Sequence, residues 1–258
     1  MAARVWIYGL ELDDGRPRRA APTNMNSDPH PPLTLSIETA TLAGSVALTR
    51  GEEILAAVPG DAKVSHSNTL LRDIDKLLSE AKVSLPEVDL FAVATGPGSF
   101  TGLRIGIATV KALAATLDRP CAGVPTLQAV ALAAGPAQLT VALLPAGRGE
   151  VFAQLFSVTD NGFVTALDQP THISPQKLLE KYSSLENVLW SGEGAIVNKS
   201  LIEQNPRWQL APQVLILATH VARLALIKFR EQRLERADTL QAIYVRPSDA
   251  ELKVNGRN

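Results

Sequence analysis

Cysteine and histidine are both scarce in this sequence. Its 258 residues include one cysteine and four histidines. The single thiol, Cys121, excludes an internal disulfide, and one thiol with four scattered histidines does not supply the ligand set of a structural zinc site. We therefore expect no bound metal, a reducing and cytoplasmic compartment, and a Cys121 that serves as a small core residue.

An excess of one charge and a long apolar run are also missing. The chain carries 25 basic and 26 acidic residues, a net charge of -1, and its basic residues form no cluster that would attract a phosphate backbone. No uninterrupted apolar run approaches the roughly 20 residues that span a bilayer. The short apolar stretch at 5–10 precedes the basic residues at 16–19, which reverses the order in a signal peptide. Direct nucleic-acid binding and a membrane location are therefore not expected.

The two ends of the chain are polar. Residues 1–32 are rich in proline, charged and small polar residues, so we expect a disordered extension there, and residues 249–258 form a polar tail. Regular periodicity begins only at Leu33, which makes Met25 an alternative start to Met1.

The first half of the chain alternates between strand and helix patterns. Strand patterns at 33–37, 44–50 and 52–58 predict an antiparallel meander. Apolar residues at helical spacing then predict an amphipathic helix at 65–81. A capping box from Ser84 to Glu87, an apolar strand at 90–95 and a second helix ending at Asp118 complete this half.

The second half repeats this order loosely. It predicts strands at 139–144, 151–158 and 188–190, a helix at 174–182, a long helix at 212–232 and a strand-like segment at 241–246. Both the strand at 90–95 and the strand at 188–190 lead into a glycine-rich turn. We therefore expect an α/β fold of two similar lobes, residues 33–132 and 133–248, each a mixed sheet flanked by helices.

The glycine-rich stretch GPGSFTGLRIG, residues 96–106, joins the predicted strand to the second helix. Backbone N–H groups in such a turn can cradle a phosphate, but the stretch matches neither GxxxxGK[ST] nor GxGxxG. The glycines equally permit a tight turn, and Gly102 and Gly106, one helical turn apart, would let another helix approach closely. Ser99 and Thr101 are placed to cap the helix. The stretch alone favours packing over ligand binding.

Several segments together resemble one protein family. LSIETATLAGSVAL at 35–48, ATGPGSFTGLRIGIATVKALA at 94–114, GRGEVF at 147–152 and AIYVR at 242–246 are similar to the TsaB (YeaZ) family of bacterial tRNA threonylcarbamoyladenosine synthesis. The resemblance covers residues 33 to about 248 and implies the actin-like (ASKHA, sugar-kinase and Hsp70-like) fold.

The resemblance also implies a noncatalytic partner of the transferase TsaD. The ATPase TsaE would join the complex, which modifies the adenosine beside the anticodon of ANN-reading tRNAs, and the tRNA would be contacted only indirectly. The helix at 66–80 and the helix after the glycine stretch would dock on TsaD, and without TsaD we expect a homodimer through the same helices. The residues assigned to this interface are His66, Leu70, Ile74, Phe100, Arg104, Ile107 and Lys111.

An enzyme is the alternative reading, either a glycoprotease-type metallopeptidase or an actin-like ATPase. Where TsaD carries an H-x-x-x-H pair, this chain has Thr126 and Val130, which cannot replace two imidazole ligands. His66 has no acid or nucleophile placed beside it by spacing, so a catalytic role is disfavoured. The sequence therefore favours the partner over the peptidase.

The ATPase reading meets similar difficulties. The first hairpin keeps an acid but no glycine, and Pro145 stands where the family usually has aspartate. We expect no cofactor in this chain, with ATP held by the partner proteins or at their interface. If the chain itself contacts a nucleotide, the residues expected to do so are Glu38, Thr39, Gly98 and Arg148.

Overall fold

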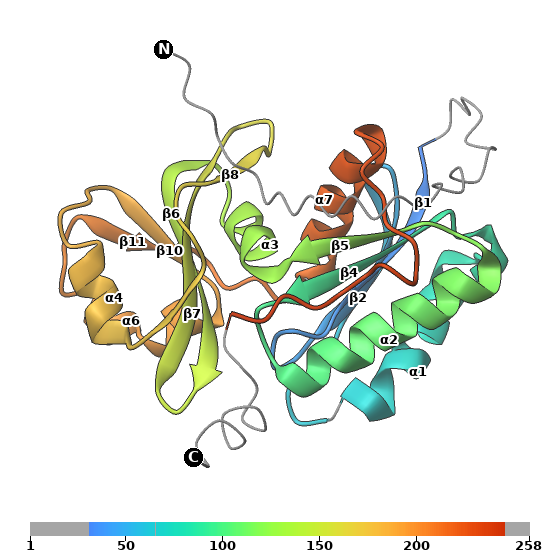
Figure 1. Ribbon diagram of the computed structural model, residues 1–258, viewed down its shortest axis with the longest axis horizontal. Coiled ribbons are helices and arrows are strands. Elements are labelled where there is room, and N and C mark those ends of the chain that lie inside the picture. The colour runs from blue at the N-terminus through green and yellow to red at the C-terminus, as the bar shows by residue number, and fades with distance from the viewer. Residues whose placement is uncertain (1–30, 65, 246–258) are drawn as a thin grey trace, which may run out of the picture. The chain divides into compact units, whose positions relative to one another are not determined.

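The chain builds two β-sheets, each covered by helices (Figure 1). The computed structural model describes residues 31–64 and 66–245, without the side chains of residues 66–68. The expectations for the N-terminal extension, the choice between Met1 and Met25, and the polar tail fall outside these residues.

The first sheet contains the predicted meander. Strands β1 (Leu33–Glu38), β2 (Ser45–Arg50) and β3 (Glu53–Pro59) pair antiparallel, and β4 (Leu90–Gly96) and β5 (Cys121–Pro125) continue the sheet parallel to β1, in the order β3-β2-β1-β4-β5. All residues of β1 and β4 are buried, because helices cover both faces of the sheet.

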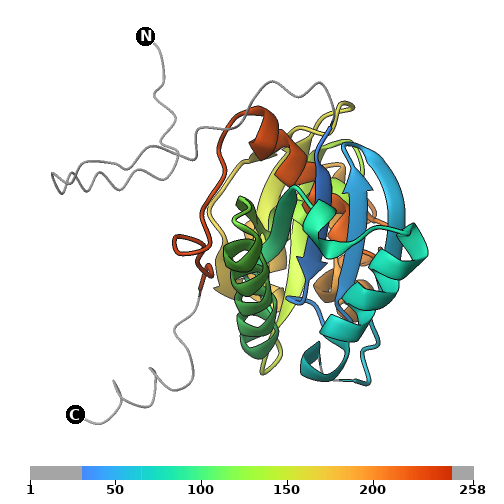
Figure 2. The same cartoon turned by 90° about the vertical axis from the view of Figure 1, so that its right-hand side faces the viewer.

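Helices α1 (His66–Ala81) and α2 (Phe100–Leu117) lie on one face of this sheet, and α7 (Ala218–Arg230) lies on the other (Figure 2). The capping box from Ser84 to Glu87 is confirmed and caps the N-terminus of a short 3-10 helix, η1 (Leu85–Glu87). The predicted cap at Ser99 is also confirmed, since its side chain accepts a hydrogen bond from the Gly102 N–H at 3.2 Å.

The second sheet has the strand order β11-β10-β6-β7-β8, with β9 also paired to β7. Its strands are β6 (Ala137–Gly147), β7 (Glu150–Val158), β8 (Val164–Ala166), β9 (Thr171–Ile173), β10 (Val188–Ser191) and β11 (Trp208–Leu210). Its helices are α4 (Pro175–Lys181), α5 (Glu193–Val197) and α6 (Lys199–Ile202), while α3 (Thr126–Ala133) packs between the two sheets. The two-lobed α/β architecture expected from the repeat is thus present.

The hydrophobic core follows the alternation of side chains in β6. Ala142 and Leu144 join a large cluster that also contains the helices and strands of the first sheet. Val141 and Leu143 point to the opposite face and join a second cluster around Trp190 and its neighbours. The larger cluster therefore spans both sheets through α3.

Two predicted elements are wrong in extent or type. The long helix expected at 212–232 begins only at Ala218, because residues 212–217 form an irregular segment. Residues 241–245 form no strand, although their composition is typical of one. They cross the end of β4 and make one backbone hydrogen bond there, from Ile243 N–H to the Thr95 carbonyl at 2.7 Å, instead of running along a sheet edge.

Candidate partner-docking site

Other parts of the same chain occupy the space beside the glycines of the glycine-rich stretch. Gly96 has a φ of 113°, and a Cβ atom there would lie 2.5 Å from the carbonyl oxygen of Ile243. At Gly98 a Cβ atom would lie 2.5 Å from the Ala40 carbonyl oxygen, and this oxygen accepts a hydrogen bond from the Ser99 N–H at 2.8 Å. The stretch is therefore a packing motif for the β1–β2 loop and the C-terminal segment.

The glycines inside α2 have the same role. The Thr39 hydroxyl donates a hydrogen bond to the Gly102 carbonyl at 2.8 Å, and a Cβ atom at Gly106 would overlap Thr39 Oγ1. Both glycines are buried beneath this loop. The expectation that Gly102 and Gly106 admit a second helix is therefore wrong, because Thr39 fills that space.

The residues expected to contact a nucleotide are mostly used inside the fold. Glu38 is buried, and its carboxylate accepts hydrogen bonds from the Thr41 N–H at 2.7 Å and the Thr41 hydroxyl at 2.6 Å. Burial raises the pKa of Glu38 above its ordinary value. Glu38, Thr39 and Gly98 lie together around the β1–β2 loop, whereas Arg148 comes from the β6–β7 turn of the second sheet.

A cavity of about 70 Å³ lies between the two sheets, beside Glu38. Its described lining includes two carboxylates, Glu38 and Glu193, and two hydroxyls, Thr41 and Ser191, with apolar side chains between them and no lysine or arginine. Two carboxylates without a basic side chain repel a phosphate chain. The cavity is also small for a nucleotide, so its lining gives no support to an ATP site.

The positions compared with the histidine pair of TsaD have structural roles. The Thr126 hydroxyl accepts a hydrogen bond from the Gly96 N–H at 3.0 Å, and Val130 is buried in the core. Within the described residues, no group of three or more His, Cys, Asp or Glu side chains is arranged to hold a metal ion. Cys121 is a buried core residue as expected, and desolvation raises the pKa of its thiol to about 11, which leaves it protonated.

The predicted interface residues divide into buried and exposed groups. Leu70, Ile74 and Ile107 are only 5%, 5% and 7% exposed, so they hold α1 and α2 on the sheet and are wrongly assigned to a docking surface. The side chain of His66 lies outside the described residues. Phe100 is 37% exposed, and the Arg104 guanidinium lies 3.9 Å from the centre of its ring. Lys111 donates a hydrogen bond to the Leu240 carbonyl at 3.1 Å.

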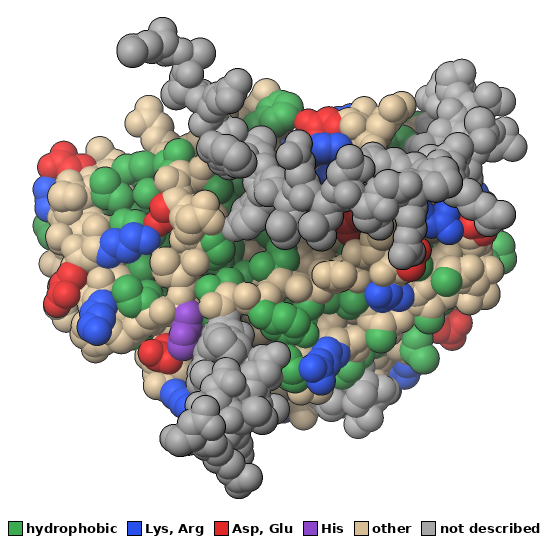
Figure 3. All heavy atoms as spheres, in the orientation of Figure 1, with side chains coloured by type: hydrophobic (Ala, Val, Ile, Leu, Met, Phe, Trp, Pro, Cys, Tyr) green, Lys and Arg blue, Asp and Glu red, His purple; other side chains and the backbone are tan. Residues whose placement is uncertain are grey.

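The outer face of α2 is exposed and carries Phe100, alanines and threonines around one exposed charged residue, Arg104. Over 18 residues its mean hydropathy is 1.3, yet only 33% of these residues are buried, and it is the one described helix long and apolar enough by composition to cross a membrane. Ala108, Ala112 and Ala115 line its exposed face, and Leu71 of α1, 68% exposed, lies on the same side of the sheet. Hydrophobic and basic side chains gather over this part of the surface (Figure 3). An exposed apolar helix face of this kind is typical of a site for another protein.

Comparisons with known proteins agree with the architecture and define its class. The family model for TsaD, tRNA N6-adenosine threonylcarbamoyltransferase, matches residues 52–241. The TsaB protein of Bacillus subtilis is 29% identical over 227 residues, which cover 85% of this chain and 96% of that protein. The TsaB protein of Escherichia coli is 28% identical over 240 residues, covering 86% and 98%. The solved structure of YeaZ from Pseudomonas aeruginosa superposes with a TM-score of 0.72 at 26% identity, covering 83% of this chain and 99% of that one.

The two lobes, their mixed sheets and the helix α3 between them define an α/β protein of the actin-like fold. The chain belongs to the family described by the TsaD model and, within it, to the TsaB (YeaZ) proteins of tRNA threonylcarbamoyladenosine biosynthesis.

Proposed function

We propose that this chain is a noncatalytic partner that binds a TsaD transferase through the exposed face of α1 and α2. The observation that carries the proposal is that only 33% of the residues of the apolar helix α2 are buried, and that Phe100, Ala108, Ala112 and Ala115 are among those left exposed. Exposing such a face to water is unfavourable, so a protein that covers it gains free energy from burial. The alanines on this face leave room for a close approach by a partner helix.

The polar groups that an enzyme of this fold would need support the same proposal. Glu38 and Thr39 are hydrogen-bonded inside their own loop or to α2, and Thr126 is bonded to the glycine stretch. A catalytic group must be free to reach a substrate atom, and these groups are occupied by the fold. Their arrangement favours a structural use over catalysis.

The remaining parts of the proposal extend the resemblance to the TsaB family. In a cytoplasmic complex, TsaE would associate through TsaD and ATP would be held by those proteins or at their interface. The complex would modify the adenosine beside the anticodon of ANN-reading tRNAs, with this chain contacting tRNA only through TsaD. Without TsaD the chain would pair with a second copy through the same apolar face, because that face is unfavourable in water.

Reconstitution with TsaD and TsaE of the same organism tests the proposal. We expect threonylcarbamoyladenosine, measured by mass spectrometry of digested tRNA, to form only when this chain is present. Ala108→Arg places a charged side chain on the exposed face and should lower both TsaD binding and modification at least about tenfold. Ala166→Arg, at an exposed alanine of β8 in the other lobe, is the matched control. Full modification without the chain would refute the partner role.

Two experiments on the purified chain, without its partners, test the enzyme alternatives. Metal analysis of the purified protein tests the peptidase, and a phosphate-release assay with ATP tests the ATPase. A stoichiometric metal or sustained turnover, abolished by a substitution in this chain, would overturn the noncatalytic role.

A further inference from the structure

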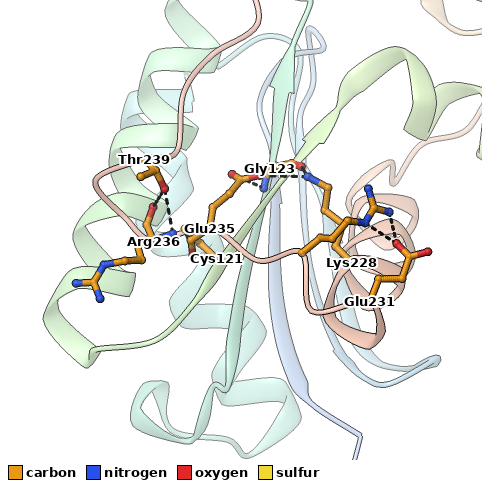
Figure 4. Close-up of polar contacts among 8 residues, drawn as sticks. Cys121, Gly123, Lys228, Glu231, Glu235, Arg236 and Thr239 are labelled. Carbon is orange, nitrogen blue, oxygen red and sulfur yellow. Dashed lines mark hydrogen bonds and ion pairs between the residues drawn. The ribbon is translucent and has the colours of Figure 1, made fainter. Parts of the chain in front are cut away.

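After α7 the chain returns across the first sheet as a strap, defined here as residues 233–245. Cys121 and Glu235 exchange two backbone hydrogen bonds, at 2.9 and 2.8 Å. The Glu235 carboxylate also accepts a hydrogen bond from the Gly123 N–H at 3.2 Å and pairs with Lys228 Nζ at 3.2 Å (Figure 4). These contacts fix the start of the strap to the edge strand β5.

The far end of the strap is fixed beside the start of α2. Leu240 is buried, its carbonyl accepts a hydrogen bond from Lys111, and the Ile243 N–H donates to Thr95. Ile243 and Tyr244 nevertheless remain 40% and 50% exposed. The Tyr244 ring lies 5.5 Å from the ring of Phe100, measured between centres.

Helix α2 lies between the strap and α1 in both views (Figures 1 and 2). Both neighbouring elements carry large exposed apolar side chains, Leu71 on α1 and Ile243 and Tyr244 on the strap. Small alanines lie on α2 between these two elements. This arrangement suits a partner helix, which can approach the alanines closely while its larger side chains contact both neighbouring elements.

The acidic residues of the strap, Glu235 and Asp238, lie within ion-pair distance of Lys228 and Arg236. Within the described part of the chain Arg104 has no hydrogen bond or ion pair, and its guanidinium lies over the Phe100 ring. Neither α2 nor residues 239–245 contain an acidic residue. The planar guanidinium of an exposed arginine that lies over an aromatic ring still offers donors that pair well with a carboxylate.

We infer that the strap forms the third side of the docking face, whose other two sides are the exposed faces of α1 and α2. We also infer that Arg104 pairs with a carboxylate on the helix that TsaD places there. This inference rests on the proposed function and extends it to two residues of the strap, Ile243 and Tyr244. Tyrosine and arginine are enriched at the energetic centres of protein interfaces, and Phe100 brings Arg104 and Tyr244 together by contacting both.

Affinity measurements between this chain and TsaD test the inference. We expect Tyr244→Ala and Arg104→Glu each to weaken Kd by about tenfold or more. The effect of Arg104→Glu should shrink as salt rises, because salt screens exposed charges. The matched controls lie on the other lobe: Phe163→Ala, at an exposed phenylalanine, and Arg207→Glu, at an exposed arginine, should leave Kd unchanged. Circular dichroism and thermal unfolding establish that each variant is folded.

The outcomes separate the inference from the proposed function. Unchanged Kd in Tyr244→Ala and Arg104→Glu, with binding lost in Ala108→Arg, would overturn the role of the strap and leave the docking function intact. If these two variants keep their affinity for TsaD but the complex binds tRNA more weakly, the role of the strap in docking is overturned. Tyr244 and Arg104 would then contact nucleic acid. No binding of the wild-type chain to TsaD would overturn both.

Discussion

Single residues decide how the glycine-rich stretch is used, and Gly96 is the clearest case. In Gly96→Ala, the alanine would have to adopt a positive φ, and its Cβ atom would lie 2.5 Å from the Ile243 carbonyl oxygen. We expect the free energy of unfolding to fall by about 3 kcal/mol, from backbone strain and overpacking together. Chemical denaturation by urea measures this loss.

Gly135 supplies the control for that substitution. Its φ is 87°, yet a Cβ atom there would meet nothing within 4 Å. Gly135→Ala should therefore cost only the backbone strain, about 1 kcal/mol. If the two variants lose equal stability, the Ile243 carbonyl does not constrain the glycine stretch.

Two glutamates should respond to pH in opposite directions. Burial raises the pKa of Glu38, so the folded protein binds its proton more tightly than the unfolded chain does. The stability that Glu38 contributes is present below its unfolded pKa, about 4.3, and is lost as pH rises through the folded value. Glu38→Gln should therefore gain stability over wild type as pH increases above about 4, in urea titrations at a series of pH values.

Glu87 provides the opposite case. Hydrogen bonds from Ser84 lower the pKa of Glu87, so its contribution is present above the unfolded pKa and is lost as pH falls. Glu87→Gln should be less stable than wild type at neutral pH and should approach it in acid. If both variants follow the same trend with pH, the burial of Glu38 does not control its protonation.

At the level of elements, periodicity predicted the meander, α1, α2 and the β6–β7 pair, because each repeats its apolar residues over enough length to give a signal. β5 and α3 were missed, since both are short and almost fully buried and so have no polar face to define a period. The strap was misread as a strand because its Ile-Tyr-Val composition reflects local packing against β4 and α2, which only the tertiary fold supplies.

The docking face shows the same limit of sequence reasoning. The helical spacing of Leu70, Ile74 and Ile107 marks the face of each helix that is buried, but it does not say whether a sheet or a partner covers that face. The exposed residues Leu71, Ala108 and Tyr244 could be recognised only once the positions of the sheet and the strap were known.

The attachment of the strap to β5 depends on the pair between Lys228 and Glu235. Lys228 Nζ donates to the Gly123 carbonyl at 2.6 Å, and Glu235 accepts from the Gly123 N–H, so both backbone polar groups of Gly123 are held. Lys228→Met and Glu235→Gln should each cost about 1–2 kcal/mol, because each leaves a partly buried polar group with a poorer partner. The double variant should cost less than the sum of the two, which a double-mutant cycle in urea measures. Strict additivity would show that the two side chains act independently.

Over the whole molecule, the shared core predicts one cooperative unfolding transition for the two sheets and their helices. The larger cluster joins both sheets through α3, where Leu127 is fully buried, while Leu178 lies in the second cluster beside Trp190 and Trp208. Leu127→Ala and Leu178→Ala should each cost about 2–5 kcal/mol. Tryptophan fluorescence reports chiefly on the second cluster, and far-ultraviolet circular dichroism reports on all helices. If the lobes unfold together, each variant shifts both signals by the same amount. If Leu178→Ala shifts only the fluorescence transition, α3 does not couple the lobes, and a partner on the first lobe would leave the stability of the second unchanged.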